Sequence, residues 1–215
     1  NRPFIEYVCN FGKPIVLSTG ASNVDEIDRA LEWIDSKGVS VALLHCVLNY
    51  PTPEEYANLR MIIGLKERYP NRVIGYSDHT LPADLRVLEL AYTLGADILE
   101  KHFTYDKSLP GNDHYHSMEA KDLTRFVELI DRIHISLGGE TKKTPIKTEN
   151  ISRMNARRSL VLNKDISANH IIEAGDLTYK RPGTGISPSK WDDVIGQKVT
   201  KNLKKDDILK WENIE

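Results

Sequence analysis

The chain has 215 residues, of which 40% are hydrophobic and 28% are charged, and its formal net charge is −2 at pH 7. This near-neutral balance gives no broad field of one sign, so nucleic acid and anionic membrane surfaces are not expected partners. No apolar run approaches the roughly 18 to 20 residues that a membrane span requires. Cys9 and Cys46 lack the spacing of a metal site, and we expect free thiols and a cytoplasmic location.

Four short apolar runs recur at intervals of roughly 30 residues, the usual length of a βα unit. They are Ile15–Thr19, Val41–Cys46, Arg72–Tyr76 and Ile98–Phe103. A segment with helical periodicity follows each run, at about 24–34, 53–65, 85–94 and 123–137. The first of these helices has Ser22 or Asn23 as its N-cap and Gly38 as its stop. The pattern predicts four parallel βα units, with Pro53 at the start of the second helix.

Two architectures build on parallel βα units: a doubly wound sheet and a (β/α)₈ TIM barrel. Four units are half of what a barrel of roughly 250 residues needs, and half a barrel leaves two open sheet edges. The chain also begins at Asn1 without a methionine. We therefore expect residues 1–138 to be the C-terminal half of a TIM barrel, with the other half upstream of Asn1.

The composition changes after residue 138. Residues 139–150 are polar, charged and without periodicity, which is typical of a linker. Residues 151–215 carry short strand-like runs separated by turn signals, and they predict a second, small, mainly β domain. The expected strands are Ser159–Leu162, Leu177–Tyr179 and Gln197–Val199.

Parallel βα folds bind their ligands at the carboxyl ends of the strands. The polar residues that follow the four runs are Ser18, Thr19, His45, Asn49, Tyr50, Ser77, Asp78, His79, Glu100, Lys101 and His102. His79 and His102 end successive runs, which strengthens the case for a metal site compared with a lone histidine, while two structural histidines stay the alternative.

The remaining histidines leave alternatives open. His45 lies between apolar neighbours and is equally a hydrogen-bonded core residue. His114 and His116 alternate with Tyr115, which is compatible with a metal site or with a loop tip. His134 and His170 are interpreted as structural or exposed.

Five motifs in order carry a family resemblance: KPIVLSTGAS, LLHCVLNYPTP, GYSDHT, ILEKHFT and PGNDH. They resemble the C-terminal half of the catalytic barrel of the sialic acid synthase (N-acetylneuraminate synthase) family. The segment SLVLNKDISANHIIEAGDLTYKRPGTGI resembles the antifreeze-like (SAF) domain, of β-clip type, that ends those enzymes. The resemblance extends over essentially the whole chain.

The resemblance implies an enzyme that condenses phosphoenolpyruvate with an N-acetylated amino sugar, N-acetylmannosamine or a related 6-deoxy sugar. The products are a nonulosonic acid and phosphate. It implies that His79 and His102 bind a divalent metal, Mn²⁺ first, with Mg²⁺ or Co²⁺ as alternatives. Because Leu48 stands where the family has Asn, the sugar can be of sialic, legionaminic, pseudaminic or spore-coat type.

Further roles follow from the resemblance, residue by residue. Ser18 and Ser77 match serines that contact phosphoenolpyruvate, and Tyr50 and Asp113 match residues around the sugar. Arg181 matches an arginine that the small domain of one protomer inserts into the active site of its partner, in a domain-swapped homodimer.

The family's catalytic glutamate and phosphate-binding lysines have no counterpart in these 215 residues, since their strands precede the matched motifs. We therefore expect the chain as given to lack full activity. The rival hypothesis is a non-catalytic carbohydrate-binding or structural module built on a half-barrel remnant.

Overall fold

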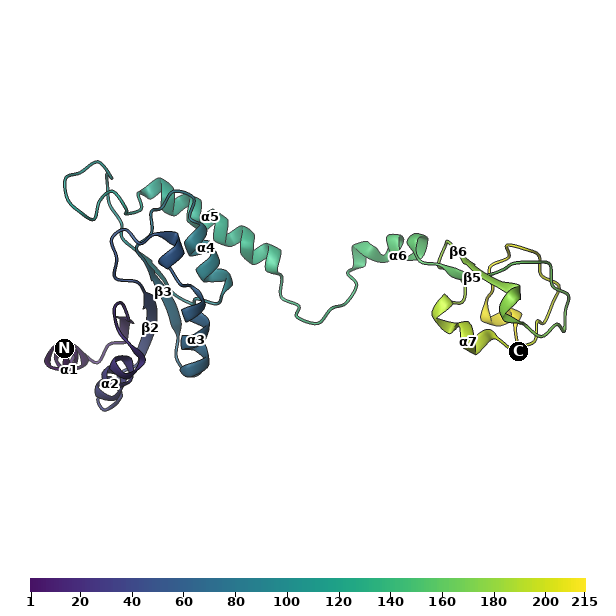
Figure 1. Cartoon of the computed structure of the whole chain (residues 1–215), viewed down its shortest axis with the longest axis horizontal. Helices are drawn as coiled ribbons and strands as arrows, with labels where there is room; N and C mark the ends of the chain where they lie inside the picture. The colour runs from purple at the N-terminus through teal and green to yellow at the C-terminus, as the bar shows by residue number, and fades with distance from the viewer. The chain divides into compact units, whose positions relative to one another are not determined.

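The computed structural model describes residues 1–215, and the chain divides into two compact units, Asn1–Gly138 and Gly139–Glu215. Figure 1 shows both units, which are described separately below. The expected limits of the linker and the small domain stay predictions.

A four-stranded parallel sheet organises the first unit. Its strands are β1 (Ile15–Ser18), β2 (Val41–Cys46), β3 (Ile74–Asp78) and β4 (Leu99–Lys101), and they lie in the order β1-β2-β3-β4. The first and last strands are the two edges of the sheet. The predicted half-barrel of four βα units is confirmed, although β3 begins two residues later than the apolar run indicates.

Helices alternate with the strands. They are α1 (Arg2–Cys9), α2 (Val24–Asp35), α3 (Arg60–Arg68), α4 (Arg86–Thr93) and α5 (Ala120–Leu137). Asn23, one of the two predicted N-caps, opens α2 in a capping box with Glu26, so each residue satisfies a free N–H of the other's backbone. The helix predicted from Pro53 is wrong in its start: a 3₁₀ turn at Glu54–Tyr56 precedes α3. The helix α1 was not predicted.

One face of the sheet packs against the helices. Leu43, Ile74 and Tyr76 alternate with residues of the other face and are at most 1% exposed. They meet Ile34 of α2 and Ile62 of α3, both fully buried. Figure 1 shows α3 and α4 beside β3, which agrees with the packing of both helices on that strand. This alternation is the period-2 pattern of a strand.

The opposite face carries the polar strand ends. In β1 it presents Val16, which is 52% exposed, and then Ser18. In β3 it presents Gly75 and then Ser77. A Cβ at Gly75 would lie 2.5 Å from the Leu44 side chain and 2.4 Å from the carbonyl oxygen of Ile98, so only glycine allows these neighbours to close over the strand.

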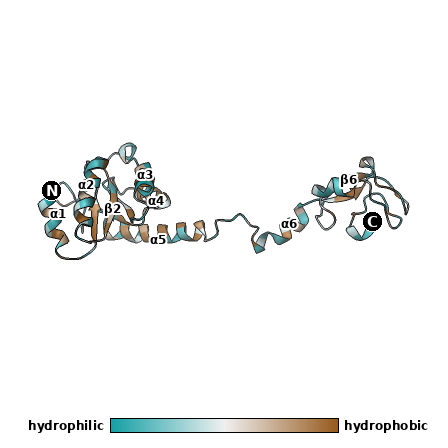
Figure 2. Ribbon diagram, turned by 90° about the horizontal axis from the view of Figure 1, so that it is seen from below, coloured by the Kyte–Doolittle hydropathy of each residue, from teal (hydrophilic) through white to brown (hydrophobic).

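The last helix of this unit is only partly covered. Along α5, brown apolar residues recur between teal polar ones (Figure 2). Phe126 and Leu129 pack against the core cluster, whereas Val127, Ile135 and Leu137 stay at least half exposed. The helix therefore contributes one apolar stripe to the core and leaves a second one outside it.

The second unit is small and mainly irregular. Strands β5 (Ser159–Leu162) and β6 (Leu177–Lys180) pair antiparallel, and α6 (Asn150–Ala156) and α7 (Trp191–Val194) are its helices. Its 3₁₀ turns are Lys147–Glu149, Ala174–Asp176, Pro188–Lys190 and Trp211–Asn213. The strand expected at Gln197–Val199 is wrong as a continuous element, because Lys198 and Val199 pair only in isolated bridges, with Ile171 and Ile214.

No helix of the chain combines the length and the apolar content that crossing a membrane requires. Cys9 and Cys46 are free thiols, as expected, and both are buried.

A buried carboxylate ties the second unit together. Asp176 has no exposed side-chain surface and accepts hydrogen bonds from His170 and from the backbone N–H of Glu173. Lys164 lies 2.6 Å from its second oxygen. Burial opposes ionisation, but these three donors outweigh it and lower the pKa of Asp176 to about 2.

This carboxylate should make the second unit sensitive to acid. The folded-state pKa lies below the ordinary value of 3.8, so the stabilisation is complete above about pH 4 and is lost as the pH falls toward 2. We expect Asp176→Asn to destabilise the unit by about 2 kcal/mol at pH 7 and by progressively less as the pH falls through about 2. Amide hydrogen exchange of residues 159–215 measures this change in stability. Asp193→Asn, which removes a half-exposed partner of Lys190, is the control. Equal protection of Asp176→Asn and wild type at pH 7 would contradict the prediction.

Candidate functional site

The register between β3 and β4 aligns the two strand-end histidines. Tyr76 pairs with Leu99, Ser77 with Glu100 and Asp78 with Lys101. The next step of the same register sets His79 beside His102. Their rings lie 5.1 Å apart, edge to face. The structure therefore brings together the two residues that the sequence predicts as metal ligands.

Hydrogen bonding fixes the tautomer of His79. The Nδ1 atom of its ring lies 2.9 Å from the carbonyl oxygen of Val47, which can only accept, so Nδ1 donates. In the neutral ring the lone pair is then on Nε2. A backbone carbonyl that holds one ring nitrogen in this way is typical of histidines that bind metals through the other nitrogen.

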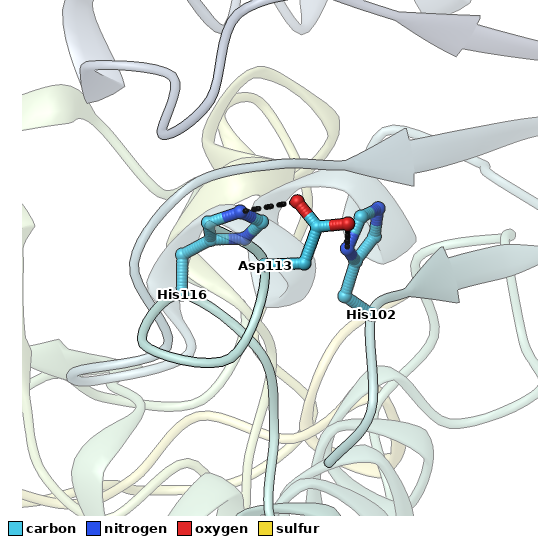
Figure 3. A group of neighbouring side chains, drawn as sticks. All are labelled: His102, Asp113 and His116. Carbon is cyan, nitrogen blue, oxygen red and sulfur yellow. Dashed lines mark ion pairs between the residues drawn. The ribbon is translucent and has the colours of Figure 1, made fainter. Parts of the chain in front are cut away.

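A third histidine and a carboxylate join His102. Ligand atoms of His102, Asp113 and His116 all lie within 4.8 Å of one another. The carboxylate of Asp113 lies between the two rings, as Figure 3 shows, with Oδ1 3.5 Å from His116 Nε2 and Oδ2 3.9 Å from His102 Nδ1. Two imidazoles and a carboxylate fit a divalent cation.

Burial keeps one of these rings neutral. His116 is completely buried, and neither of its ring nitrogens has a hydrogen-bond partner. This burial, reinforced by the nearby His102, lowers the pKa of His116. The ring is therefore uncharged at pH 7 and has a lone pair to offer.

Tyr50 is the common neighbour of the histidines. Its ring centre lies 4.1 Å from that of His79 and 5.8 Å from those of His102 and His116. Burial raises the pKa of its hydroxyl, so the hydroxyl remains a proton donor at neutral pH. A molecule that enters the space between the histidines would therefore contact Tyr50.

The three other predicted site residues lie in different places. Ser77 is buried two residues before His79, on the same face of the strand, and its hydroxyl donates to Glu100 at 2.9 Å. Ser18 lies at the carboxyl end of β1, two strands away from β3, and is exposed. Arg181 belongs to the second unit, where it is exposed and donates to the carbonyl oxygen of Ala156 at 3.1 Å.

A charged pair supports the site from the helix-facing side of the sheet. Lys101 Nζ lies 2.7 Å from Asp78 Oδ2, and the two side chains are only 5% and 1% exposed. Asp78 also accepts hydrogen bonds from the Tyr76 hydroxyl and from the backbone and hydroxyl of Thr80. These bonds hold the backbone on both sides of His79, so the pair positions that histidine without touching it.

Two other histidines are structural. His45 donates from Nε2 to the carbonyl oxygen of Ala57 at 2.8 Å and stacks on Tyr76, so the core alternative applies to it. His114 bonds the hydroxyl of Thr104 at 2.8 Å. Of the two loop histidines, only His116 reaches the cluster.

The sequence pattern did not predict the contact between Asp78 and Lys101. It also did not decide whether His116 belongs to a metal site or to a loop tip. The β3–β4 pairing, once known, identifies the pair, because Asp78 and Lys101 are register partners. No pattern signals His116, because the loop from residue 104 to residue 117 has no period.

These observations define the class of protein. A parallel βα half-barrel with two histidines at the carboxyl ends of adjacent strands and a carboxylate in the loop that follows, joined to a small β unit, is part of a barrel fold with an appended domain. The comparison with known families agrees. The model of the NeuB family matches residues 1–142, and the model of the SAF domain matches residues 157–215. The chain belongs to the NeuB family.

Several relatives are named as synthases of legionaminic, pseudaminic or N-acetylneuraminic acids. The chain is 37% identical over 98% of its length to N,N'-diacetyllegionaminic acid synthase of Campylobacter jejuni, and covers 63% of it. It is 34% identical over 98% of its length to pseudaminic acid synthase of Helicobacter pylori, and covers 61% of it. The solved N-acetylneuraminic acid synthetase of Leptospira borgpetersenii, in complex with citrate, matches 70% of this chain and 51% of its own, with a TM-score of 0.62 and 37% identity. The chain spans less than two thirds of the curated relatives that it matches.

Loss of the buried pair should destabilise the first unit. Asp78→Asn leaves the ammonium group of Lys101 buried without a counter-charge, and breaking such a pair costs about 3 to 5 kcal/mol. Urea unfolding of the chain measures the change. Asp84→Asn, which removes the half-exposed partner of Arg86, should change stability little. If Asp78→Asn unfolds at the urea concentration of the wild type, the pair does not hold the segment around His79.

Proposed function

We propose that the chain forms the C-terminal part of a synthase that condenses phosphoenolpyruvate with an N-acetylated amino sugar and yields a nonulosonic acid and phosphate. Family membership and the named activities of the relatives support the reaction class. The observation that carries the proposal is the pair of His79 and His102 at one level of adjacent strands, beside Tyr50 and Asp113.

His79 and His102 would hold a divalent cation, with Mn²⁺ expected first and Mg²⁺ or Co²⁺ as alternatives. Nε2 of His79 is the free nitrogen of that ring, since Nδ1 donates to Val47. When bound, the cation supplies Lewis-acid withdrawal of electron density from the aldehyde oxygen of the open-chain sugar. The chain's part is to hold the two nitrogens at a fixed separation, through the β3–β4 register and the Asp78–Lys101 pair.

The reaction balances without a redox partner. Carbon 3 of phosphoenolpyruvate forms a bond to the aldehyde carbon, and the carbonyl oxygen takes up a proton and becomes a hydroxyl. Water adds at carbon 2, and the carbon–oxygen bond to phosphate breaks. The new keto group is that of the nonulosonic acid.

Four further residues would hold the substrates. The hydroxyl of Ser18 can donate to the carboxylate or phosphate of phosphoenolpyruvate, and that of Ser77 can do so when it turns away from Glu100, to which it donates in the structure. Tyr50 and Asp113 would contact the sugar, with the protonated Tyr50 hydroxyl as a donor and the Asp113 carboxylate, 65% exposed, as an acceptor for sugar hydroxyls. The catalytic glutamate and the lysines of the family are not among these residues, so we propose that the 215 residues alone lack full activity.

An enzyme assay tests the proposed function. It uses the polypeptide in the form that its native cell produces. We expect phosphate release from phosphoenolpyruvate that depends on an N-acetylated sugar, is abolished by a chelator and is restored by Mn²⁺. N-acetylmannosamine and diacetamido 6-deoxy sugars of the legionaminic and pseudaminic type form the substrate panel. We expect the His79→Ala, His102→Ala double variant to lose bound Mn²⁺ and at least about 100-fold in activity, because Lewis-acid stabilisation contributes several kcal/mol.

The control is His134→Ala, since His134 lies on α5 and contacts Tyr92 outside the site. Unchanged Mn²⁺ stoichiometry in the double variant would refute the metal assignment. Sugar binding without phosphate release, for every sugar of the panel, would favour the non-catalytic carbohydrate-binding module. The cytoplasmic location stays a prediction.

A two-fold symmetric homodimer is the proposed assembly. Arg181 is exposed, and none of the ion pairs of the chain involves it, so most of its guanidinium donors are free for an acyl or carboxylate group. The 12 residues of the expected linker can span about 40 Å when extended. That reach lets the small unit of one protomer extend to the site of the other.

Complementation distinguishes the two possible uses of Arg181. Arg181→Ala and His79→Ala, each inactive alone, are mixed under conditions that exchange subunits. If Arg181 completes the site of the partner, one site of a mixed dimer has both defects and the other has neither, so about half of the activity per mixed dimer returns. No recovery after verified exchange would mean that Arg181 serves its own chain.

A further inference from the structure

His116 has an unusual environment. It is completely buried, and both of its ring nitrogens lack a hydrogen-bond partner. In the first unit it is the only side chain with buried unpartnered nitrogen or oxygen atoms. Leaving a buried polar group unpaired costs about 1 to 3 kcal/mol, so an imidazole in this state needs an explanation.

The loop that carries His116 is held tightly. The N–H of Met118 donates to the carbonyl oxygen of His102, and the N–H of Thr104 donates to the carbonyl oxygen of Met118, both at 2.8 Å. The Ser117 hydroxyl donates to the carbonyl oxygen of Asp113 at 2.6 Å. These bonds fix the backbone of residues 113–118 against the end of β4, and they direct the ring of His116 toward His102.

The ring faces a set of metal-ligating groups. Its centre lies 5.1 Å from that of His102, and its Nε2 lies 3.5 Å from Asp113 Oδ1. Two ligands that each lie about 2.1 Å from a tetrahedral ion are about 3.4 Å apart. The Asp113–His116 separation matches that value. The Asp113–His102 distance of 3.9 Å is within the reach of a small rotation of the exposed carboxylate.

We propose that His116 is a third imidazole ligand of the divalent cation, in addition to His79 and His102, and that it shifts the preference of the site from Mn²⁺ toward Zn²⁺ and Co²⁺. This inference rests on the proposed metal site. Its ground is the pair of unpartnered nitrogens, one of which a cation would satisfy.

The expected change in preference follows from ligand chemistry. Carboxylate and water ligands suit Mn²⁺ and Mg²⁺, whereas each added imidazole favours Co²⁺ and Zn²⁺, which also stand higher in the general affinity order of divalent ions. A site with three imidazoles therefore binds Zn²⁺ more tightly, relative to Mn²⁺, than a site with two imidazoles.

Metal titration of the complete chain tests this proposal. Zn²⁺ and Mn²⁺ are titrated separately, by calorimetry, into wild type, His116→Phe, His102→Ala and His114→Phe. Phenylalanine keeps an aromatic ring of similar volume in the buried place and offers no lone pair. His114 lies in the same loop and has its own partner, Thr104, so His114→Phe is the matched control.

We expect His116→Phe to weaken Zn²⁺ binding by at least about 30-fold and to lower the ratio of Zn²⁺ to Mn²⁺ affinity by about tenfold or more. His114→Phe should leave both affinities unchanged. In a second measurement, on wild type with ¹⁵N-labelled histidine, Zn²⁺ should move the ring-nitrogen signals of His102 and His116 together and leave that of His114 in place.

The outcomes separate the two proposals. If His102→Ala abolishes Zn²⁺ binding while His116→Phe binds as wild type does, the role of His116 is refuted and the proposed function stands. If wild type binds neither ion, or if His102→Ala and His116→Phe both bind as wild type does, both proposals fail. Should His116→Phe fail to fold, the ring-nitrogen signals of the wild type decide the question alone.

Discussion

The parallel register between β3 and β4 is the constraint on which the site depends. Ser77 faces Glu100 and Asp78 faces Lys101, so each strand alternates its side chains in step with its neighbour. A slip of one residue would exchange the two faces of the strand. The slip would direct the side chain of Asp78 to the face opposite the helices. It would direct that of His79 toward the helices. The burial of Ile74 and Tyr76 against the helices forbids that slip, and so the hydrophobic core indirectly aligns the two histidines.

The two faces of the sheet treat polar groups differently. On the helix-facing side, Asp78 and Lys101 are buried, and their charges are paired and hydrogen-bonded. On the other side, Ser18 is exposed, His102 has no hydrogen-bonded partner for its ring, and His116 is buried without one. The buried charges on the helix-facing side are fully paired, so the unpartnered groups on the other side are an exception that needs an explanation. Buried or unpartnered polar groups at the carboxyl ends of the strands therefore favour the proposed binding site over poor packing.

The sequence predicted the parts of this fold that depend on short-range periodicity. The four apolar runs and their helices follow from burial on one face, and the N-cap at Asn23 follows from its side-chain chemistry. Prediction was weaker where pairing is long-range or local geometry is irregular. The small unit forms isolated bridges instead of a strand at residues 197–199, because its segments are joined by single contacts such as Val199–Ile214. The motifs named Tyr50, Asp113 and the two strand-end histidines, which lie close together in the structure. The contact of Asp78 with Lys101 emerges only when the pairing of β3 with β4 is known.

His116 illustrates a limit of motif-based inference that has a physical origin. A motif records residue types at fixed spacings along the chain, whereas the position of His116 depends on the bonds that fold residues 104–118 back onto the end of β4. The same loop carries His114, identical in type and two residues away, yet its ring bonds Thr104 instead of joining the cluster. The difference between the two lies in burial and in hydrogen-bond satisfaction, which no spacing encodes. Among several histidines in one loop, the buried ring with both nitrogens unpartnered is the one whose energy a bound cation would lower most, and this criterion selects His116.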